Sequence, residues 1–206
     1  MVDRPVYRPS VLSATAQAEL DHVAERLTRP AVVVICGFPG SGKTTAATYL
    51  ATCCGAVVLD KDRFAPRLER DVLRALGSDP FDRDGELYRT VLSPGIYDAL
   101  IRVGLSIGSR YPTVLDAPFL SVIRDAAESG SVLAPYLRRR AQMPDSLMVH
   151  TVWIDVPAAE LAERMILRGA ERDVSKLGDW AAYRSAVLDG GLREIAHGVV
   201  DVVIGN

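Results

Sequence analysis

The chain has 206 residues, of which 49% are hydrophobic and 24% charged, with a formal net charge of −2. This length and composition are typical of one globular domain with a full core. They exclude a membrane span, since no apolar run is long enough, and they argue against a large nucleic-acid interface, which usually makes a domain basic. Because no apolar leader follows the charged N-terminus, we expect a cytoplasmic protein.

The first elements expected along the chain are a helix and a buried strand. Residues 1–12 contain two prolines and are expected to be irregular. Apolar spacing of three and four predicts a helix over residues 13–28, with Ser13 as its N-cap, so residues 1–29 form an N-terminal extension and helix. The continuously apolar residues 31–36 then predict a strand of a parallel sheet that is buried on both faces.

Residues 37–44 read GFPGSGKT and fill every fixed position of the phosphate-binding pattern G-x-x-x-x-G-K-[ST]. Backbone N–H groups of this loop and of the helix expected after it, over residues 45–51, would cradle the β-phosphate of ATP. Lys43 would reach the β- and γ-phosphates, and the hydroxyl of Thr44 would hold Mg²⁺. The predicted nucleotide-binding residues here are Gly37, Phe38, Pro39, Gly40, Ser41, Gly42, Lys43, Thr44 and Thr45.

Strands and helices alternate along the rest of the chain. Further strands are expected over residues 56–59, 113–115, 147–156 and 199–204. Helices are expected over residues 68–76, 85–107, 131–142, 158–169 and 176–188, with Pro94 breaking the second of them. This alternation predicts an α/β fold, a P-loop NTPase three-layer sandwich with a five-stranded parallel sheet. No repeat or linker divides residues 1–206, so we expect one domain.

Acidic residues stand at the ends of two predicted strands, the edge where such folds bind ligands. A phosphoryl-transfer enzyme needs a carboxylate that orients or deprotonates the acceptor hydroxyl. Asp62 is the candidate base after the second strand, with Asp60 in reserve, although either could instead cap the following helix. Asp116 ends the third strand and is a candidate Mg²⁺ ligand or a turn residue. Which of the three is the base stays open.

Arg164, Arg168 and Arg172 recur at intervals of four. The first two share a helix face, and Gly169 would let the chain leave the helix and carry the third over the site. Arginines on a mobile segment can stabilise the charge on a transferring phosphoryl group, so residues 161–189 are a candidate arginine-bearing helical lid. Arg164 could flank the adenine. The alternative is a solvated helix face paired with nearby glutamates.

The glycine loop, the Asp-Lys-Asp segment after the second strand and the pattern R-x-x-x-R-x-x-x-R-D together resemble small P-loop kinases. These are related to polynucleotide 5′-kinases, zeta toxins, chloramphenicol phosphotransferase and gluconate kinase, and the chain resembles more closely still a group of bacterial AAA family ATPases of its length. The resemblance spans residues 31–189. It implies that Asp62 is the base and that the three spaced arginines belong to the lid.

One departure from the polynucleotide kinase pattern concerns the arginine that follows the base by three residues. That position is Ala65 here, so Arg63 or Arg67 would have to replace it. The segment 78–88 occupies the place where these folds carry an acceptor lid. Its carboxylates, arginine and aromatic rings suit a sugar, nucleoside or antibiotic, and its negative charge would repel a polyphosphate acceptor. It could equally be a solvated acidic loop. The predicted substrate-binding residues are Arg63, Arg67, Asp82, Arg83 and Tyr88.

The resulting hypothesis is a kinase that uses ATP and Mg²⁺ to phosphorylate a hydroxyl group of a small molecule. Its predicted catalytic residues are Asp62, Lys43, Arg168, Arg172 and Asp60. One alternative is a kinase of polynucleotide 5′-hydroxyls or nucleotide sugars, which would need a basic groove that the net charge does not favour. Another is a nucleotide-dependent switch without an acceptor, which would need a water-positioning residue and no arginine lid. Nucleic acid and membranes are not expected partners, and the sequence leaves open the acceptor, the choice between ATP and GTP, and the oligomeric state.

Overall fold

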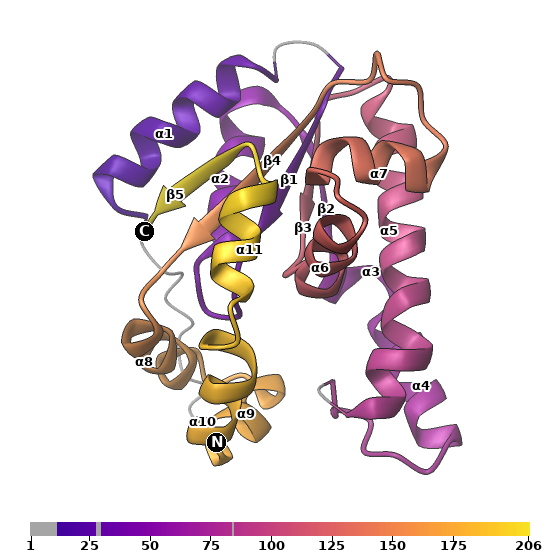
Figure 1. The fold of residues 1–206 in the computed structure, drawn as a ribbon, viewed down its shortest axis with the longest axis vertical. Coiled ribbons are helices and arrows are strands. Elements are labelled where there is room, and N and C mark those ends of the chain that lie inside the picture. The colour runs from indigo at the N-terminus through magenta and orange to yellow at the C-terminus, as the bar shows by residue number, and fades with distance from the viewer. Residues whose placement is uncertain (1–11, 28–29, 84) are drawn as a thin grey trace, which may run out of the picture.

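The computed structural model describes residues 12–27, 30–83 and 85–206, so the irregular N-terminus expected over residues 1–12 lies almost wholly outside them. A sheet of five parallel strands in the order β2-β3-β1-β4-β5 forms its centre (Figure 1). The strands are β1 (Val32–Cys36), β2 (Val57–Asp60), β3 (Thr113–Asp116), β4 (Val149–Asp155) and β5 (Val202–Gly205). Each overlaps a predicted strand, and the predicted α/β fold with its five-stranded parallel sheet is confirmed.

Helices cover the sheet and extend beyond it. They are α1 (Ala14–Glu25), α2 (Lys43–Cys54), α3 (Lys61–Phe64), α4 (Pro66–Ala75), α5 (Ser93–Gly108), α6 (Leu120–Glu128), α7 (Leu133–Ala141), α8 (Ala158–Arg168), α9 (Val174–Gly178), α10 (Trp180–Tyr183) and α11 (Leu192–Val199). Short segments of other helix types accompany them: η1 (Tyr88–Leu92) and η3 (Arg184–Leu188) are π-helical, and η2 (Glu171–Asp173) is a 3₁₀ turn. In the described part of the chain, every helix is too short or too polar to cross a lipid bilayer.

The central strand β1 contributes to a separate core on each face of the sheet. Val32, Val34 and Cys36 pack with side chains of α5, α6, α7 and α11. Val33 and Ile35 pack with side chains of α1 and α2. Since all five residues of β1 are buried, the sheet is covered on both faces, as a continuously apolar strand requires. The result is the three-layer sandwich that the sequence predicts.

Two helix boundaries follow the local signals in the sequence. Ser13 caps α1, because its hydroxyl oxygen accepts a hydrogen bond from the backbone N–H of Ala16 at 3.1 Å. Pro94 lies in the first turn of α5, directly after the π-helical η1, so the helix type changes beside the proline. The backbone stays helical from η1 into α5, and the break expected at Pro94 is a boundary between two helix types, with no gap between helices.

Other boundaries differ from the sequence-based expectation. The helix expected over residues 176–188 is three pieces, α9, α10 and η3, because the side chain of Asp179 accepts from the N–H of Ala182 and starts a new helix. The expected last strand begins three residues late, since Val199 still belongs to α11 and packs with the buried Leu192 and Ala196. Helices α3, α6 and α11 have no counterpart among the predicted elements.

Two groups of helices extend past the sheet at one end of the molecule. Figure 1 shows α8, α9 and α10 together on one side and α4 beside α5 on the other. On the α4 side, Leu73, Tyr88, Leu92 and Ile96 form a small apolar cluster of their own. The loops that follow β1, β2 and β3 lie between these two groups of helices.

Candidate active site

The loop after β1 has the backbone that a phosphate-binding loop needs. Gly37 has φ +144°, and a Cβ there would lie 2.7 Å from the carbonyl oxygen of Ile154 and 2.7 Å from the hydroxyl of Ser41. Gly40 and Gly42 also have positive φ values, which favour glycine. The ammonium of Lys43 donates to the carbonyl oxygen of Phe38 at 2.8 Å, so the lysine lies folded across its own loop.

Side chains on both sides of this loop hold it in place. The ring of Phe38 is buried and meets Trp153 edge-on, with 5.1 Å between the ring centroids, so its contribution to a phosphate site is limited to its backbone. On the other side, the carbonyl oxygen of Ser41 accepts from Asn206 at 3.1 Å and from Arg164 at 3.4 Å. Arg164 also donates to Glu160 at 3.0 Å, so the predicted adenine-flanking residue lies beside the loop and is partly neutralised.

Asp116, at the end of β3, is buried beside the start of α2. Burial raises the pKa of its carboxyl to about 6, against the opposing effects of Lys43 and of a hydrogen bond with Thr44. Its Oδ2 has no hydrogen-bond partner among the described residues. A buried carboxylate oxygen next to a hydroxyl fits a hard cation such as Mg²⁺, which takes one or two carboxylates together with substrate phosphates. Thr44 and Asp116 thus fit the predicted metal site.

Asp60 acts as a helix cap. Its Oδ1 accepts from the backbone N–H of Asp62 at 2.8 Å, which fixes the first turn of α3 immediately after β2. Asp60 also lines the cavity described below, so capping and a place at the site coexist in this residue. The sequence allowed either role for both aspartates, and the side chain of Asp62 instead points to the neighbouring cations.

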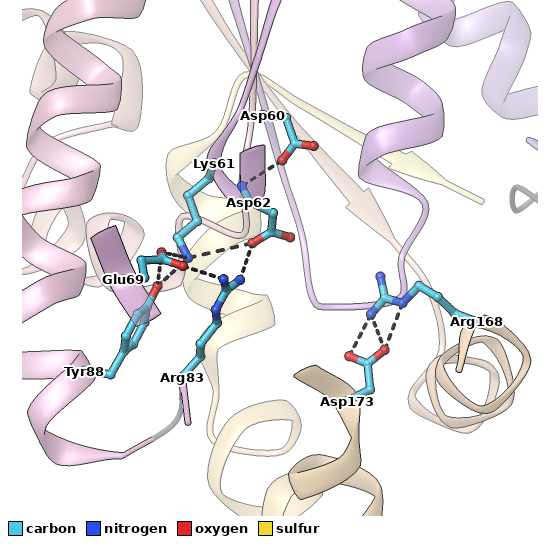
Figure 2. A network of polar contacts seen from close by, with 8 residues as sticks. All are labelled: Asp60, Lys61, Asp62, Glu69, Arg83, Tyr88, Arg168 and Asp173. Carbon is cyan, nitrogen blue, oxygen red and sulfur yellow. Dashed lines mark hydrogen bonds and ion pairs between the residues drawn. The ribbon is translucent and has the colours of Figure 1, made fainter. Parts of the chain in front are cut away.

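A buried polar cluster surrounds Asp62, and Figure 2 shows its members. The ammonium of Lys61 lies 3.1 Å from Glu69 and 3.8 Å from Asp62, and it donates to the hydroxyl of Tyr88, which itself donates to Glu69 at 3.0 Å. Arg83 donates to Asp62 at 2.9 Å and pairs with the other oxygen of Glu69. The cluster therefore joins α3 and α4 to the segment that leads into η1.

Glu69 is the central member of this cluster, and no motif in the sequence predicts its role. Its side chain is almost fully buried, yet it contacts two cations and a phenol. Burial lowers the pKa of Lys61, although Glu69 and Asp62 oppose the shift, and burial together with Glu69 raises the pKa of Tyr88. The available signal was its position: Glu69 stands four residues before the buried Leu73, on the apolar face of α4.

The segment after α8 supplies a second ion pair on the opposite side of the site (Figure 2). Arg168 makes hydrogen bonds of 2.6–2.8 Å to both carboxylate oxygens of Asp173, which is buried. Asp173 is the last residue of the pattern R-x-x-x-R-x-x-x-R-D, and the pattern alone assigns it no role. The predicted Arg172 belongs to η2, but its side chain lies outside the described part of the structure. That residues 161–189 close as a lid stays a prediction.

One cavity of about 330 Å³ connects these groups. The predicted site residues that line it are Pro39, Lys43, Thr44, Asp60, Asp62, Arg83, Tyr88, Asp116 and Arg168. Three predicted substrate-binding residues, Arg63, Arg67 and Asp82, are not among the lining residues. Arg67 is an exposed residue of α4 that pairs with Asp71 at 3.5 Å. Asp82 accepts from the N–H of Gly85 at 2.7 Å and so stabilises its own loop.

A family model described as "AAA domain" matches residues 32–187. Among solved structures, a proposed fructose transport system kinase from Silicibacter sp. TM1040 is similar at 18% identity, covering 93% of this chain and 99% of that one with a TM-score of 0.51. A gluconokinase from Sinorhizobium meliloti 1021 follows at 22% identity, 83% and 90% coverage and a TM-score of 0.46. A shikimate kinase from Acinetobacter baumannii is similar at 19% identity, 89% and 87% coverage and a TM-score of 0.42.

These identities are low enough that the likeness concerns the fold alone. No curated protein matches the sequence.

Proposed function

This chain belongs to the AAA domain family, and on that premise we propose that it is a kinase that uses ATP and Mg²⁺ to phosphorylate a hydroxyl group of a small molecule. The observation that carries the proposal is one cavity lined by Lys43, Thr44, Asp62 and Arg168. Phosphoryl transfer asks little covalent chemistry of a protein and depends on positioning and charge neutralisation. A lysine, a hydroxyl, a carboxylate and an arginine are the side chains that such a reaction uses.

In the proposed reaction, the hydroxyl oxygen of the acceptor forms a bond to the γ-phosphorus of ATP. The bond from that phosphorus to the β–γ bridging oxygen breaks, ADP leaves, and the hydroxyl proton passes to the carboxylate of Asp62. Thr44 and Asp116 would hold Mg²⁺, which supplies positive charge to the phosphate oxygens. Lys43 and Arg168 stabilise the negative charge that spreads over the transferring group.

The protein orients these groups before substrates bind. Asp62 is held at the cavity by Arg83 at 2.9 Å and by Lys61 at 3.8 Å. Arg168 is held by two-point pairing with Asp173, which fixes the plane of its guanidinium. Groups fixed in advance need little reorganisation as charge develops, which is the main source of electrostatic catalysis.

The lining of the cavity favours a kinase over a nucleotide-dependent switch. Besides the P-loop residues Lys43 and Thr44, it includes Arg83, Tyr88 and Tyr97, which come from outside the P-loop. A switch that hydrolyses ATP needs only room for a water next to the γ-phosphate. The additional polar and aromatic side chains suit an acceptor molecule with its hydroxyl at Asp62.

The test is ADP release by the purified protein with ATP and Mg²⁺, with and without candidate acceptors. The panel comprises nucleosides, sugars, sugar acids, aminoglycosides and an oligonucleotide with a 5′-hydroxyl. We expect one small hydroxylated compound to stimulate ADP release, and Asp62→Asn to reduce that stimulation by about a hundredfold or more. The matched control is Asp71→Asn, which alters an exposed carboxylate of α4 outside the cavity.

Stimulation by the oligonucleotide would instead identify a polynucleotide kinase. ATP binding without acceptor-dependent turnover, unchanged in Asp62→Asn, would contradict the proposed function.

A further inference from the structure

The acidic loop before η1 does not place its described carboxylates in the cavity. Asp79 accepts from the backbone N–H of Phe81 at 2.9 Å, and Asp82 accepts from that of Gly85 at 2.7 Å. Neither aspartate is among the cavity-lining residues. These two side chains therefore give no basis for the repulsion of a polyphosphate acceptor that the sequence suggests.

Two arginines bring positive charge to the cavity instead. Arg89 belongs to η1 and Arg124 to α6, and both line the cavity with exposed side chains. Among the described residues, neither guanidinium has a hydrogen-bond or ion-pair partner. The other two arginines of the lining, Arg83 and Arg168, are paired with carboxylates. The positive charges of Arg89 and Arg124 are thus left to be balanced by solvent or by a ligand.

The chain order puts both arginines on elements that follow or adjoin β3, the strand beside β2, although α6 also packs against α11, the helix before β5. Helix α6 follows β3, and η1 leads directly into α5, which packs on β3 and against α3, the helix that carries Asp62. The P-loop follows β1, and α8 to η3 follow β4, on the other side of β1 from β2 and β3. An ATP molecule on the P-loop therefore leaves the Asp62 side of the cavity, with Arg89 and Arg124, to the second substrate.

We propose that the second substrate is an anionic hydroxyl compound, a carboxylate or a phosphate ester, whose anionic group binds Arg89 and Arg124 while its hydroxyl lies at Asp62. This inference rests on the proposed kinase function and names the class of its acceptor. The planar guanidinium group binds carboxylate and phosphate oxygens in pairs, so two arginines suit one such group. A neutral acceptor would leave both charges to be balanced by solvent alone.

The experiment measures binding and turnover separately. With the nucleotide site filled by a non-hydrolysable ATP analogue and Mg²⁺, thermal unfolding is followed with inorganic sulfate as the simplest anion and with matched pairs. The pairs are gluconate with glucose for the carboxylate class, and glycerol 3-phosphate with glycerol and uridine monophosphate with uridine for the phosphate class. ADP release from ATP is measured with the same compounds.

We expect sulfate and the anionic member of at least one pair to raise the melting temperature. That member should also be preferred about tenfold or more over its neutral partner in kcat/KM. In the double variant Arg89→Gln/Arg124→Gln, sulfate should no longer raise the melting temperature. The variant should also lose the preference for the anionic acceptor, because its KM for that acceptor rises while its KM for ATP is unchanged. The matched control Arg110→Gln/Arg139→Gln changes two exposed arginines outside the cavity and should behave like the wild type.

Three outcomes would overturn the inference: no sulfate shift, a shift that survives in Arg89→Gln/Arg124→Gln, or turnover with neutral compounds alone. The last of these would still support the kinase. Loss of the sulfate shift in the double variant, without acceptor-dependent turnover by any compound, would support the anion site and contradict the proposed function.

Discussion

The buried carboxyl of Asp116 makes the stability of the metal-free protein depend on pH. Burial raises its pKa to about 6, whereas the unfolded chain has the ordinary value of 3.8. The folded state therefore binds more protons between these values, so this residue weakens folding as the pH rises from about 4 to about 6. We expect Asp116→Asn to raise the free energy of unfolding by up to about 3 kcal/mol near pH 7.5 and by little near pH 4.

Urea denaturation of the wild type and of Asp116→Asn in EDTA, near pH 7.5 and near pH 4, measures the difference in their free energies of unfolding. The variant should lose Mg²⁺-dependent tightening of nucleotide binding at the same time. An equal effect of the substitution at both pH values would show that the carboxyl is not held near neutrality by burial.

Gly37 has less room for a side chain than Gly40, the next glycine of the phosphate-binding loop. Its φ of +144° and the 2.7 Å approach of a Cβ to the carbonyl oxygen of Ile154 both exclude a larger residue without a shift of the loop. We expect Gly37→Ala to weaken binding of an ATP analogue by about tenfold or more, since strain of this kind costs about 1–3 kcal/mol. Gly198→Ala is the control, because a Cβ there meets open space. Calorimetric titration of both variants decides the matter, and equal affinities would contradict the expected loop shift.

At the scale of elements, the buried cluster around Glu69 fastens α3 and α4 to η1. Removing the carboxylate leaves Lys61 and Arg83 with an uncompensated share of buried positive charge, which usually costs about 3–5 kcal/mol. We expect Glu69→Leu to lower the free energy of unfolding by that amount. Hydrogen exchange should quicken in α4 and η1 before it quickens in β1. Lys61→Met in the Glu69→Leu background should restore part of the loss, because it removes one of the stranded charges.

The control for this series is Glu128→Leu, at an exposed glutamate near the end of α6. The explanation is wrong if Lys61→Met adds to the destabilisation of Glu69→Leu. It is also wrong if exchange quickens equally throughout the sheet. Denaturant unfolding gives the first comparison, and exchange followed by mass spectrometry gives the second.

The sequence predicts elements well where one strong local signal decides the structure. All five strands are rich in apolar residues, and each is predicted to within a few residues. The signal is strongest for β1, which is buried along its whole length, whereas the edge strands β2 and β5 are partly exposed. The prediction of one continuous helix over residues 176–188 is wrong, because the side chain of Asp179 caps a new helix and this outweighs the apolar spacing around it. Helices α6 and α11 are short and depend on tertiary packing for their stability, so the local sequence does not predict them.

The same reasoning explains which site residues were predictable. The phosphate-binding loop and the acids at the strand ends follow from motif and topology, and the structure brings them to one cavity. Glu69, Asp173, Arg89 and Arg124 reach the site through tertiary folding of helices whose relative placement the sequence does not state. Charged residues on helices are common on surfaces, so their types alone gave no signal.

At the scale of the whole molecule, the phosphate-binding loop is a meeting point of distant parts of the chain. The N–H of Gly37 donates to the carbonyl oxygen of Pro118 at 3.4 Å, and the carbonyl oxygen of Ser41 accepts from Asn206 at 3.1 Å. Asn206 in turn accepts from the N–H of Ser13 at the start of α1. A ligand that rigidifies this loop therefore stabilises its contacts to the segment after β3 and, through Asn206, to the start of α1.

Nucleotide binding should consequently raise the melting temperature of the entire molecule in one step. A ligand at about a hundred times its dissociation constant adds about 2.7 kcal/mol to the free energy of unfolding, which for a chain of this size corresponds to about 5–10 °C. Lys43→Met keeps the volume of the side chain and removes the charge that opposes the effect of burial on the Asp116 carboxylate. We therefore expect a somewhat lower melting temperature without ligand and almost no shift with ATP analogue and Mg²⁺. Differential scanning calorimetry measures both quantities. The ammonium of Lys43 lies across the loop where the phosphates would bind, so binding there depends on its charge. A full shift of the melting temperature in Lys43→Met would therefore mean that the nucleotide binds elsewhere.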